Sequence, residues 1–121
     1  MRGFFYCSVK SLIHRDGWYN KDMDQKLIIE TEKIFKLLGN KQRLTILVLL
    51  RAHEYTVSEI IDILNMEQSA VSHQLKLLRE AQLVQPKRDG RKVVYALSDS
   101  HVLTLLKNAM DHVEHRLGDD I

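Results

Sequence analysis

The chain has 121 residues, of which 45% are hydrophobic and 28% are charged, and its formal net charge is +2 at pH 7. This length suits one domain, and this composition is typical of a folded globular protein rather than a disordered one. No apolar stretch is longer than Ile46–Leu50, whereas a membrane-spanning helix needs about 20 apolar residues. Cys7 is the single cysteine, so no internal disulfide can form, and a cytoplasmic location is expected.

The sequence divides into an arm, a domain and a tail. Residues 1–22 show no helical period and are expected to form a loosely ordered arm, unless translation of the native protein begins at Met23. The regular pattern that starts there predicts one domain over residues 23–117, followed by a short tail at 118–121.

Helical periodicity predicts the first two helices. Apolar residues recur at helical spacing from Leu27 to Leu38, and Gly39 is expected to end this first helix. Asn40 can cap a second helix, which we expect to be almost completely buried. Its apolar positions are Leu44, Leu47, Val48 and Leu50.

Two further helices are predicted after a polar break at residues 51–55. The sequence Thr56–Glu59 fits a capping box, in which the threonine hydroxyl and the glutamate carboxylate satisfy free backbone amides, and a short helix follows through Leu64. A turn at residues 65–67 leads to another helix from about Gln68 to Glu80. The apolar side of that helix carries Val71, Leu75 and Leu78.

The strand signal of the chain comes next. Two β-prone runs, residues 83–88 and 91–97, flank Asp89-Gly90 and predict a hairpin, and Pro86 indicates that the first strand lies at an edge or is short. Ser98 is expected to cap a last helix from about Asp99 to His115. The fold class is therefore mainly α with a small β-hairpin, in the order of a winged helix-turn-helix.

The polar residues of the helix-turn-helix and the hairpin indicate DNA binding. Residues 73–92 carry six cations against two anions. The second helix of such a unit lies in the major groove, where glutamine can contact adenine and serine can contact a base or a phosphate. Its expected outward residues are Gln68, Ser69, Ser72, His73, Gln74 and Lys76. The hairpin adds cations that suit phosphates or the minor groove, namely Lys87, Arg88, Arg91 and Lys92. The predicted partner is double-stranded operator DNA.

A second constellation lies on the last predicted helix, where Asp99-x-His101 is followed by His112-x-x-His115. His101 and His112 share a helix face, but about 16 Å separates them along one axis, so one chain cannot gather all four residues around one ion. Two antiparallel copies of the helix can gather four ligands around one ion, because Asp99 and His101 of one chain then lie beside His112 and His115 of the other. The pattern predicts a homodimer through its terminal helices, with two identical sites, provided that Asp99 lies at the irregular start of the helix. Three imidazoles and one carboxylate suit tetrahedral Zn(II) best, and Co(II) is the next most suitable ion.

Three stretches resemble the ArsR/SmtB family of bacterial metal-responsive repressors: Leu37–Leu47, Ser69–Leu78 and Arg88–Tyr95. The resemblance covers about residues 24–116, and the terminal pattern of acid and histidines is similar to the site of the family's zinc and cobalt sensors. It implies a dimer that binds its operator without metal and releases it with metal, so that efflux or sequestration genes are expressed. Other branches place cysteines in the third helix, and the equivalent Glu54–Glu59 has none, which argues against thiolate sensing of arsenic, cadmium or lead.

Alternatives remain open at this point. A winged-helix regulator could respond to oxidation of Cys7 instead of a metal, or the metal could only stabilise the dimer. Cys7 and His14 could supply an extra ligand, although an idle arm is favoured. A zinc hydrolase is disfavoured, because it needs an open coordination position and a general base, whereas four protein ligands would close this site.

Overall fold

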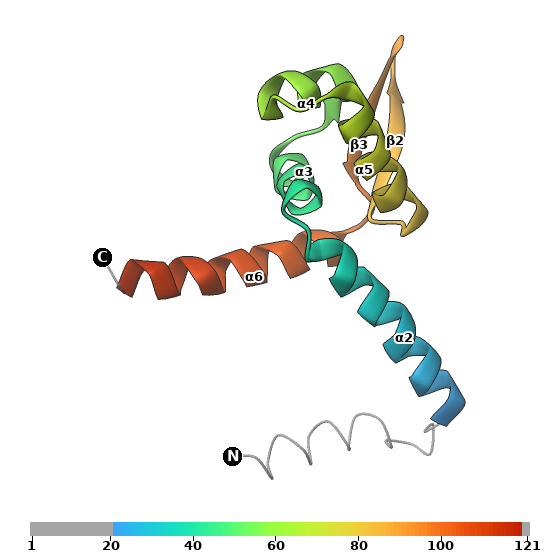
Figure 1. The fold of residues 1–121 in the computed structure, drawn as a ribbon, viewed down its shortest axis with the longest axis vertical. Coiled ribbons are helices and arrows are strands. Elements are labelled where there is room, and N and C mark those ends of the chain that lie inside the picture. Colours follow the sequence, from blue (N-terminus) through green and yellow to red (C-terminus); the bar gives the residue numbers. More distant parts are fainter. Residues whose placement is uncertain (1–20, 120–121) are drawn as a thin grey trace. The chain divides into compact units, whose positions relative to one another are not determined.

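A computed structural model describes residues 21–119, so the expected arm, with Cys7 and His14, lies almost entirely outside the described residues. The chain separates into two compact units between Phe35 and Lys36. The described helices are α2 (Lys21–Leu38), α3 (Lys41–Ala52), α4 (Val57–Leu64), α5 (Gln68–Glu80) and α6 (Ser100–Asp119) (Figure 1). The strands are β1 (Tyr55–Thr56), β2 (Val84–Asp89) and β3 (Lys92–Leu97).

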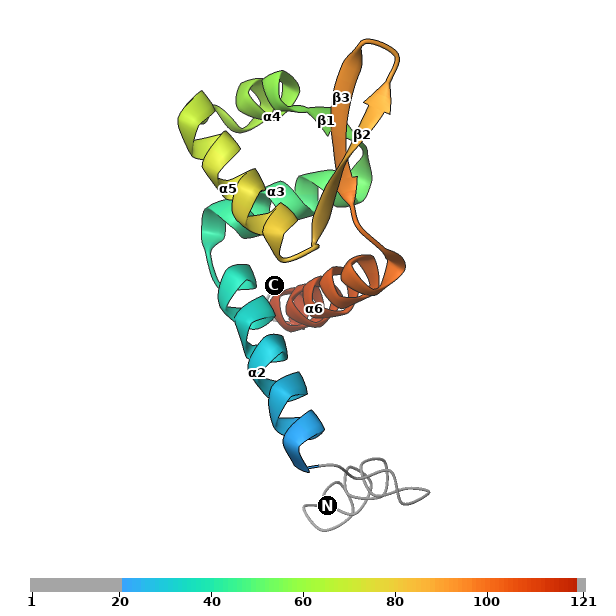
Figure 2. The ribbon, with the colours of Figure 1, turned by 90° about the vertical axis from the view of Figure 1, so that its right-hand side faces the viewer.

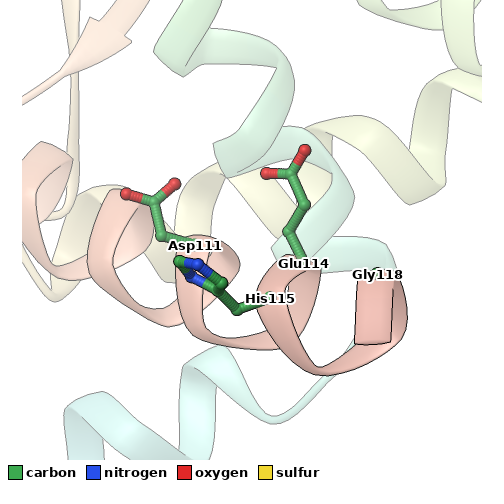
Figure 3. Close-up of a pocket in the computed structure, with 4 residues that line it drawn as sticks. All are labelled: Asp111, Glu114, His115 and Gly118. Carbon is green, nitrogen blue, oxygen red and sulfur yellow. The ribbon is translucent and has the colours of Figure 1, made fainter. Parts of the chain in front are cut away.

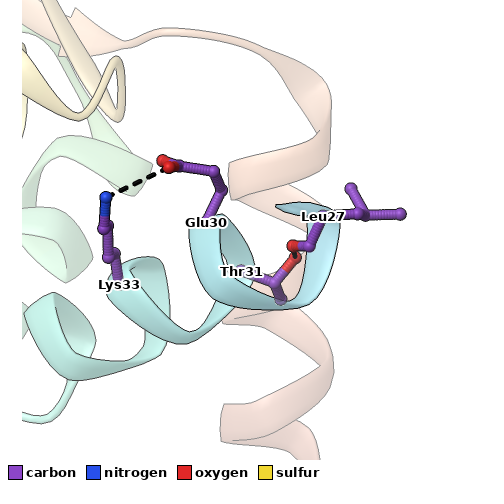
Figure 4. Close-up of polar contacts among 4 residues, drawn as sticks. All are labelled: Leu27, Glu30, Thr31 and Lys33. Atoms are coloured by element: carbon purple, nitrogen blue, oxygen red, sulfur yellow. Dashed lines mark hydrogen bonds and ion pairs between the residues drawn. The ribbon is translucent and has the colours of Figure 1, made fainter. Parts of the chain in front are cut away.

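Helix α2 ends at Leu38 as its periodicity predicted, but it begins at Lys21, earlier than expected and within the predicted arm, and its polar contacts are local. Thr31 Oγ1 donates to the Leu27 carbonyl oxygen at 2.7 Å, and Lys33 Nζ pairs with Glu30 at 3.0 Å. Figure 4 shows the Leu27 side chain pointing away from this ion pair. Four large apolar side chains of α2 are exposed in one chain, namely Leu27, Ile28, Ile29 and Phe35, whereas Ile34, Leu37 and Leu38 are half-buried. Such a face is typical of a helix that another protein surface covers.

Helix α3 begins as predicted, because the Asn40 side chain accepts a hydrogen bond from the Arg43 backbone N–H at 3.1 Å. Its burial is one-sided rather than nearly complete. Ile46, Leu47 and Leu50 are buried, whereas Leu44 is 39% exposed. At 100° per residue, Leu44 lies outside the arc that these three residues occupy, which explains why the expected burial of Leu44 is wrong.

The capping box that opens α4 is present. Thr56 Oγ1 accepts from the Glu59 N–H at 3.1 Å, and the Thr56 N–H donates to the Glu59 carboxylate at 2.9 Å. These bonds from the Thr56 backbone and hydroxyl lower the pKa of Glu59, so the carboxylate is ionised at neutral pH. Because the folded pKa is the lower one, the stabilisation is complete above the ordinary pKa and is lost as acid protonates Glu59.

Replacing Thr56 by alanine should lower the free energy of unfolding by about 1 kcal/mol, since the hydroxyl that accepts the Glu59 N–H is removed. Urea denaturation at neutral pH measures this change. Ser58→Ala is the matched control, because Ser58 is exposed in the first turn of the same helix. A loss in the control as large as that in Thr56→Ala would contradict the capping role.

Helices α4 and α5 form the predicted helix-turn-helix. Asn65 ends α4 in the left-handed conformation, with φ of 51°, which asparagine tolerates better than most residues. Ile60 of α4 is buried with three residues of α5, and these are the Val71, Leu75 and Leu78 expected inside. The two helices contact each other, and the burial of these apolar residues stabilises the pair.

The sheet has the strand order β1-β3-β2 (Figure 2). The predicted hairpin is confirmed and Pro86 does lie on an edge strand, where its missing N–H is tolerated. Asp89 still pairs with Lys92, so the turn consists of Gly90 and Arg91 rather than Asp89 and Gly90. Gly90 has φ of +65°, which favours glycine. Strand β1 was not predicted, because two residues inside a polar break are too few to show alternation.

Helix α6 starts differently from the prediction. Ser98 is not the cap, because the helix begins two residues later, at Ser100, and the Ser98 N–H donates to the Leu83 carbonyl oxygen at 3.0 Å at the base of the hairpin. The side chain of Asp99 accepts from the Val102 N–H at 3.0 Å instead. The helix continues to Asp119, two residues past the expected domain end. Among the described residues, no helix is both long and apolar enough to cross a membrane.

Candidate DNA interface and metal-binding residues

Helix α5 presents a polar outer face, as expected of the second helix of a helix-turn-helix, and we call it the recognition helix. The exposed residues on this face are Gln68, Ser69, Ser72, His73 and Lys76. Gln74 is the exception, because only 8% of its surface is exposed. The prediction that Gln74 faces outward to DNA is therefore wrong. Its spacing from Val71, Leu75 and Leu78 is that of one helix face, and this signal in the sequence could have placed it inside.

The hairpin β2–β3, which we call the wing, carries the other predicted cations. All four are exposed, with Lys87 and Arg88 on β2, Arg91 in the turn and Lys92 on β3. Figure 2 shows the hairpin projecting beyond α4 and α5. Lys87 Nζ pairs with the Glu54 carboxylate at 3.1 Å, so its charge is partly neutralised within the protein. The cations closest to the tip are the best placed for an external anion, and they are Arg91 in the turn, Lys92 next to it and Arg88 one strand pair further back.

The start of α6 brings two predicted metal ligands together. Asp99 Oδ1 lies 3.7 Å from His101 Nδ1, with the two side chains 53% and 93% exposed. This approach is possible because Asp99 precedes the helix rather than belonging to its regular turns. The hydrogen bond from the Val102 N–H holds the carboxylate on the side where His101 emerges.

The other two predicted ligands, His112 and His115, are exposed near the end of α6. Asp111, Glu114, His115 and Gly118 line a pocket there, and Figure 3 shows the Asp111 side chain beside the imidazole and the Glu114 side chain extending away from it. Lys107 Nζ donates to Asp111 at 2.8 Å, and this bond is the main cause that lowers the pKa of Asp111. Asp111 is therefore an ionised carboxylate that already has a cationic partner.

In the described part of one chain, no three histidine, cysteine, aspartate or glutamate side chains converge on a point where a metal could sit. The ligands predicted at the two ends of α6 remain two separate pairs in a single copy. A site built from all four therefore needs a second copy of the chain, and the shared site stays a prediction.

Comparison with known proteins places this arrangement in a family. Residues 40–85, which span α3 to the start of β2, match the family model described as "Bacterial regulatory protein, arsR family". The chain is 41% identical over 93 residues to the HTH-type transcriptional regulator NmtR of Mycobacterium tuberculosis, covering 77% of this chain and 78% of NmtR. The chain belongs to the ArsR family.

One further relative and one solved structure agree with this assignment. A transcriptional repressor SmtB homolog from Synechocystis is 37% identical over 82 residues, covering 68% of this chain and 62% of the homolog. The homodimeric winged helix-turn-helix DNA-binding domain Mb0332 from Mycobacterium bovis has a TM-score of 0.75 at 26% identity, covering 81% of this chain and 91% of that one. The chain is therefore a DNA-binding transcription regulator of the ArsR family and not an enzyme, which removes the hydrolase alternative.

Proposed function

We propose that this ArsR-family regulator is a metal-sensing repressor, which binds operator DNA as a metal-free dimer and is released by Zn(II) or Co(II). The observation that carries the proposal is the 3.7 Å approach of Asp99 Oδ1 to His101 Nδ1 at the start of α6. Side chains two residues apart diverge in a regular helix, so this approach requires Asp99 to lie at an irregular helix start. The sequence pattern predicted such a start on the condition that Asp99 and His101 bind the same ion. The resemblance to repressors of the same family agrees with it.

The donor chemistry fits a borderline metal ion. Asp99 and His101 of one protomer would supply one oxygen and one nitrogen, and the partner's His112 and His115 would supply two more nitrogens. Four such ligands suit tetrahedral Zn(II), and the same set accepts Co(II). All four side chains are exposed in the single chain, so a second α6 can reach them without repacking the core.

DNA would be contacted by the exposed residues of the recognition helix and by the wing. Gln68 and Ser72 lie in the first half of α5, the part that reaches base edges in a helix-turn-helix complex. Arg88 and Arg91 would bind phosphates or enter the minor groove. Two copies related by a two-fold axis would place two recognition helices in successive major grooves, about 34 Å apart.

Metal and DNA can influence each other because α6 contacts the DNA-binding unit directly. Helix α6 packs against β3, and Arg51 at the end of α3 donates to Met110 Sδ at 3.7 Å. Metal that joins two α6 helices would therefore restrain both winged domains. We infer that the restrained dimer spaces its recognition helices poorly for the operator.

The deciding experiment measures fluorescence anisotropy of a labelled fragment of the protein's own promoter, first without metal and then with zinc, at fixed salt. Tight binding that zinc reverses is the expected result. Binding that zinc leaves unchanged, while zinc raises the melting temperature, would reduce the site to a structural one. Failure of the metal-free protein to bind the fragment would contradict the repressor proposal for that promoter.

The double variant Arg88→Gln/Arg91→Gln should weaken DNA binding roughly tenfold, to a similar extent on all sequences, because the two cations that bind phosphates are removed. The slope of log K against log salt concentration should become shallower by about 0.9 for each DNA phosphate that the variant no longer neutralises. Anisotropy over a salt series measures both quantities. The control Lys26→Gln/Lys33→Gln removes the same charge from α2, and an equal effect there would argue against a specific role of the wing.

A further inference from the structure

Among the residues whose side chains are described, Gln74 is the only polar one that is buried. It lies in the middle of the recognition helix, on the side opposite the exposed residues that were expected to contact DNA. A buried amide is costly unless both its oxygen and its nitrogen have partners. Leucine or methionine would fill this position without that requirement.

Both ends of the Gln74 amide do have partners, and both partners belong to the first turn of α3. Arg43 Nη1 donates to Gln74 Oε1 at 3.1 Å. Gln74 Nε2 donates to Gln42 Oε1 at 2.9 Å. These two bonds cross more than 30 residues of sequence and join α5 to α3.

Arg43 is itself fixed from two other directions. Its Nε donates to the carbonyl oxygen of Leu37, in the last turn of α2, at 3.0 Å. Its backbone N–H donates to the Asn40 side chain that caps α3. The Gln74 amide therefore meets a guanidinium that has little freedom to move, and the hydrogen bonds run from the end of α2 to the recognition helix.

We propose that Gln74 is a positioning residue, whose bonds to Arg43 and Gln42 fix the rotation of the recognition helix about its own axis; this rests on the proposed DNA binding by α5. Apolar contacts are not directional, so Val71, Leu75 and Leu78 can accept a range of rotations. Hydrogen bonds are directional, and the amide satisfies both partners at one rotation only.

The rotation matters because of the geometry of the outer face. A helix with side chains has a radius of about 5–6 Å, so a 30° rotation moves an outer group by about 3 Å. That displacement is as long as a hydrogen bond to a base edge. Phosphate contacts from the flexible wing cations would tolerate it, whereas base contacts from Gln68 or Ser72 would not.

Two substitutions test this proposal with opposite expectations. Gln74→Met keeps the length of the side chain and removes both hydrogen bonds. Gln74→Glu keeps an acceptor for Arg43, and the Gln42 amide can turn its NH₂ group toward the carboxylate. Anisotropy at fixed salt, with the promoter fragment and with a scrambled duplex, gives the ratio of specific to non-specific affinity, and thermal melting confirms that each variant is folded.

Gln74→Met should lower specific affinity at least tenfold and change the non-specific affinity less than twofold, while Gln74→Glu stays within about threefold of the parent. A glutamate variant weaker than the methionine variant would indicate direct contact between residue 74 and DNA, and would overturn the proposal. An unchanged methionine variant, or equal losses on both duplexes, would overturn it as well. If Gln74→Met does not fold, Arg43→Lys is the second test. This substitution removes the guanidinium that donates to both Gln74 and Leu37, and it should give the same loss of specificity.

A measurement without DNA separates this proposal from the proposed function. Residual dipolar couplings of the ¹⁵N-labelled protein report the orientation of α5 relative to α3. The orientation should change in Gln74→Met and stay as in the parent in Gln74→Glu. An unchanged orientation in the methionine variant would overturn the positioning role, whether or not the parent binds the promoter fragment.

Discussion

Replacing His112 by alanine should abolish the release of DNA by zinc and leave DNA binding by the metal-free protein unchanged. His112 is exposed on α6, contributes nothing to the core and lies far along the helix from the start, where Asp99 and His101 meet. Its removal would take one nitrogen from each of the two shared sites. Anisotropy titrations of the promoter fragment, with and without zinc, measure both properties.

The size of the effect follows from linkage. A coupling free energy of about 3 kcal/mol corresponds to a zinc-induced loss of DNA affinity of more than a hundredfold. In His112→Ala this zinc-induced loss should disappear, and DNA should no longer weaken zinc binding, because the coupling is reciprocal. Release by zinc that persists in the variant would remove this histidine from the sensing site.

The matched control is His53→Ala. His53 is exposed, and its ring contacts Tyr55 edge-on with 5.1 Å between centroids, so it lies outside the predicted ligand set. The control should retain the full response to zinc. Parallel titration of the parent protein with Co(II) should show one metal per protomer, since the proposed dimer has two identical sites.

The second large effect is expected from Phe35→Glu, which should dissociate the dimer. Phe35 is 56% exposed on α2, and Leu27, Ile28 and Ile29 of the same helix are also exposed in one chain. Burying a phenylalanine contributes about 1.5–3 kcal/mol, and a two-fold interface contains the residue twice. The loss of about 3–6 kcal/mol should raise the dimer dissociation constant more than a hundredfold, since 1.4 kcal/mol is about tenfold.

Sedimentation velocity over a concentration series measures this dissociation, and promoter binding should weaken with it because each operator half-site needs a recognition helix. Lys26→Gln is the control, because it changes the net charge by the same amount on the opposite side of α2. Nine residues at 100° each place the two positions half a turn apart. A Phe35→Glu protein that remains dimeric would exclude this face from the interface.

The fold was largely predictable because local signals agreed with one another. The capping box at Thr56, the asparagine cap at Asn40 and the glycine turn of the hairpin each determine backbone geometry over a few residues. Hydrophobic periodicity then placed the helices between them. Such signals depend on neighbouring residues alone, so they can be interpreted without tertiary contacts.

The wrong predictions share a different cause, which is competition between distant partners. Ser98 has the right chemistry for a cap, but its N–H pairs with Leu83, and the next residue becomes the cap. Gln74 has the right chemistry for a base contact, but Arg43 and Gln42 bind it inside. Both outcomes depend on residues that the tertiary fold brings together. The spacing of Gln74 indicates that it lies inside, but nothing near it in the sequence reveals which partners it finds there.

The candidate site divides in the same way. The convergence of Asp99 and His101 follows from where a helix begins, so it could be expected from sequence. Whether Asp99 and His101 share an ion with His112 and His115 depends on a second copy of the chain. That shared site is predicted only from the spacing of the four residues along the helix. The experiments on His112 and Phe35 test these two requirements separately, one through the metal and the other through the interface.

The position of β2 at the edge of the sheet has a consequence for how the protein behaves at high concentration. An edge strand offers unpaired backbone groups to any other strand and can seed aggregation. Pro86 removes one donor from this edge, and the exposed Lys87 and Arg88 repel the edge of a second copy. Arg88, which is proposed to bind phosphate, is thus also expected to oppose self-association of the free protein through its sheet, and a variant that neutralises it should self-associate more readily at high concentration.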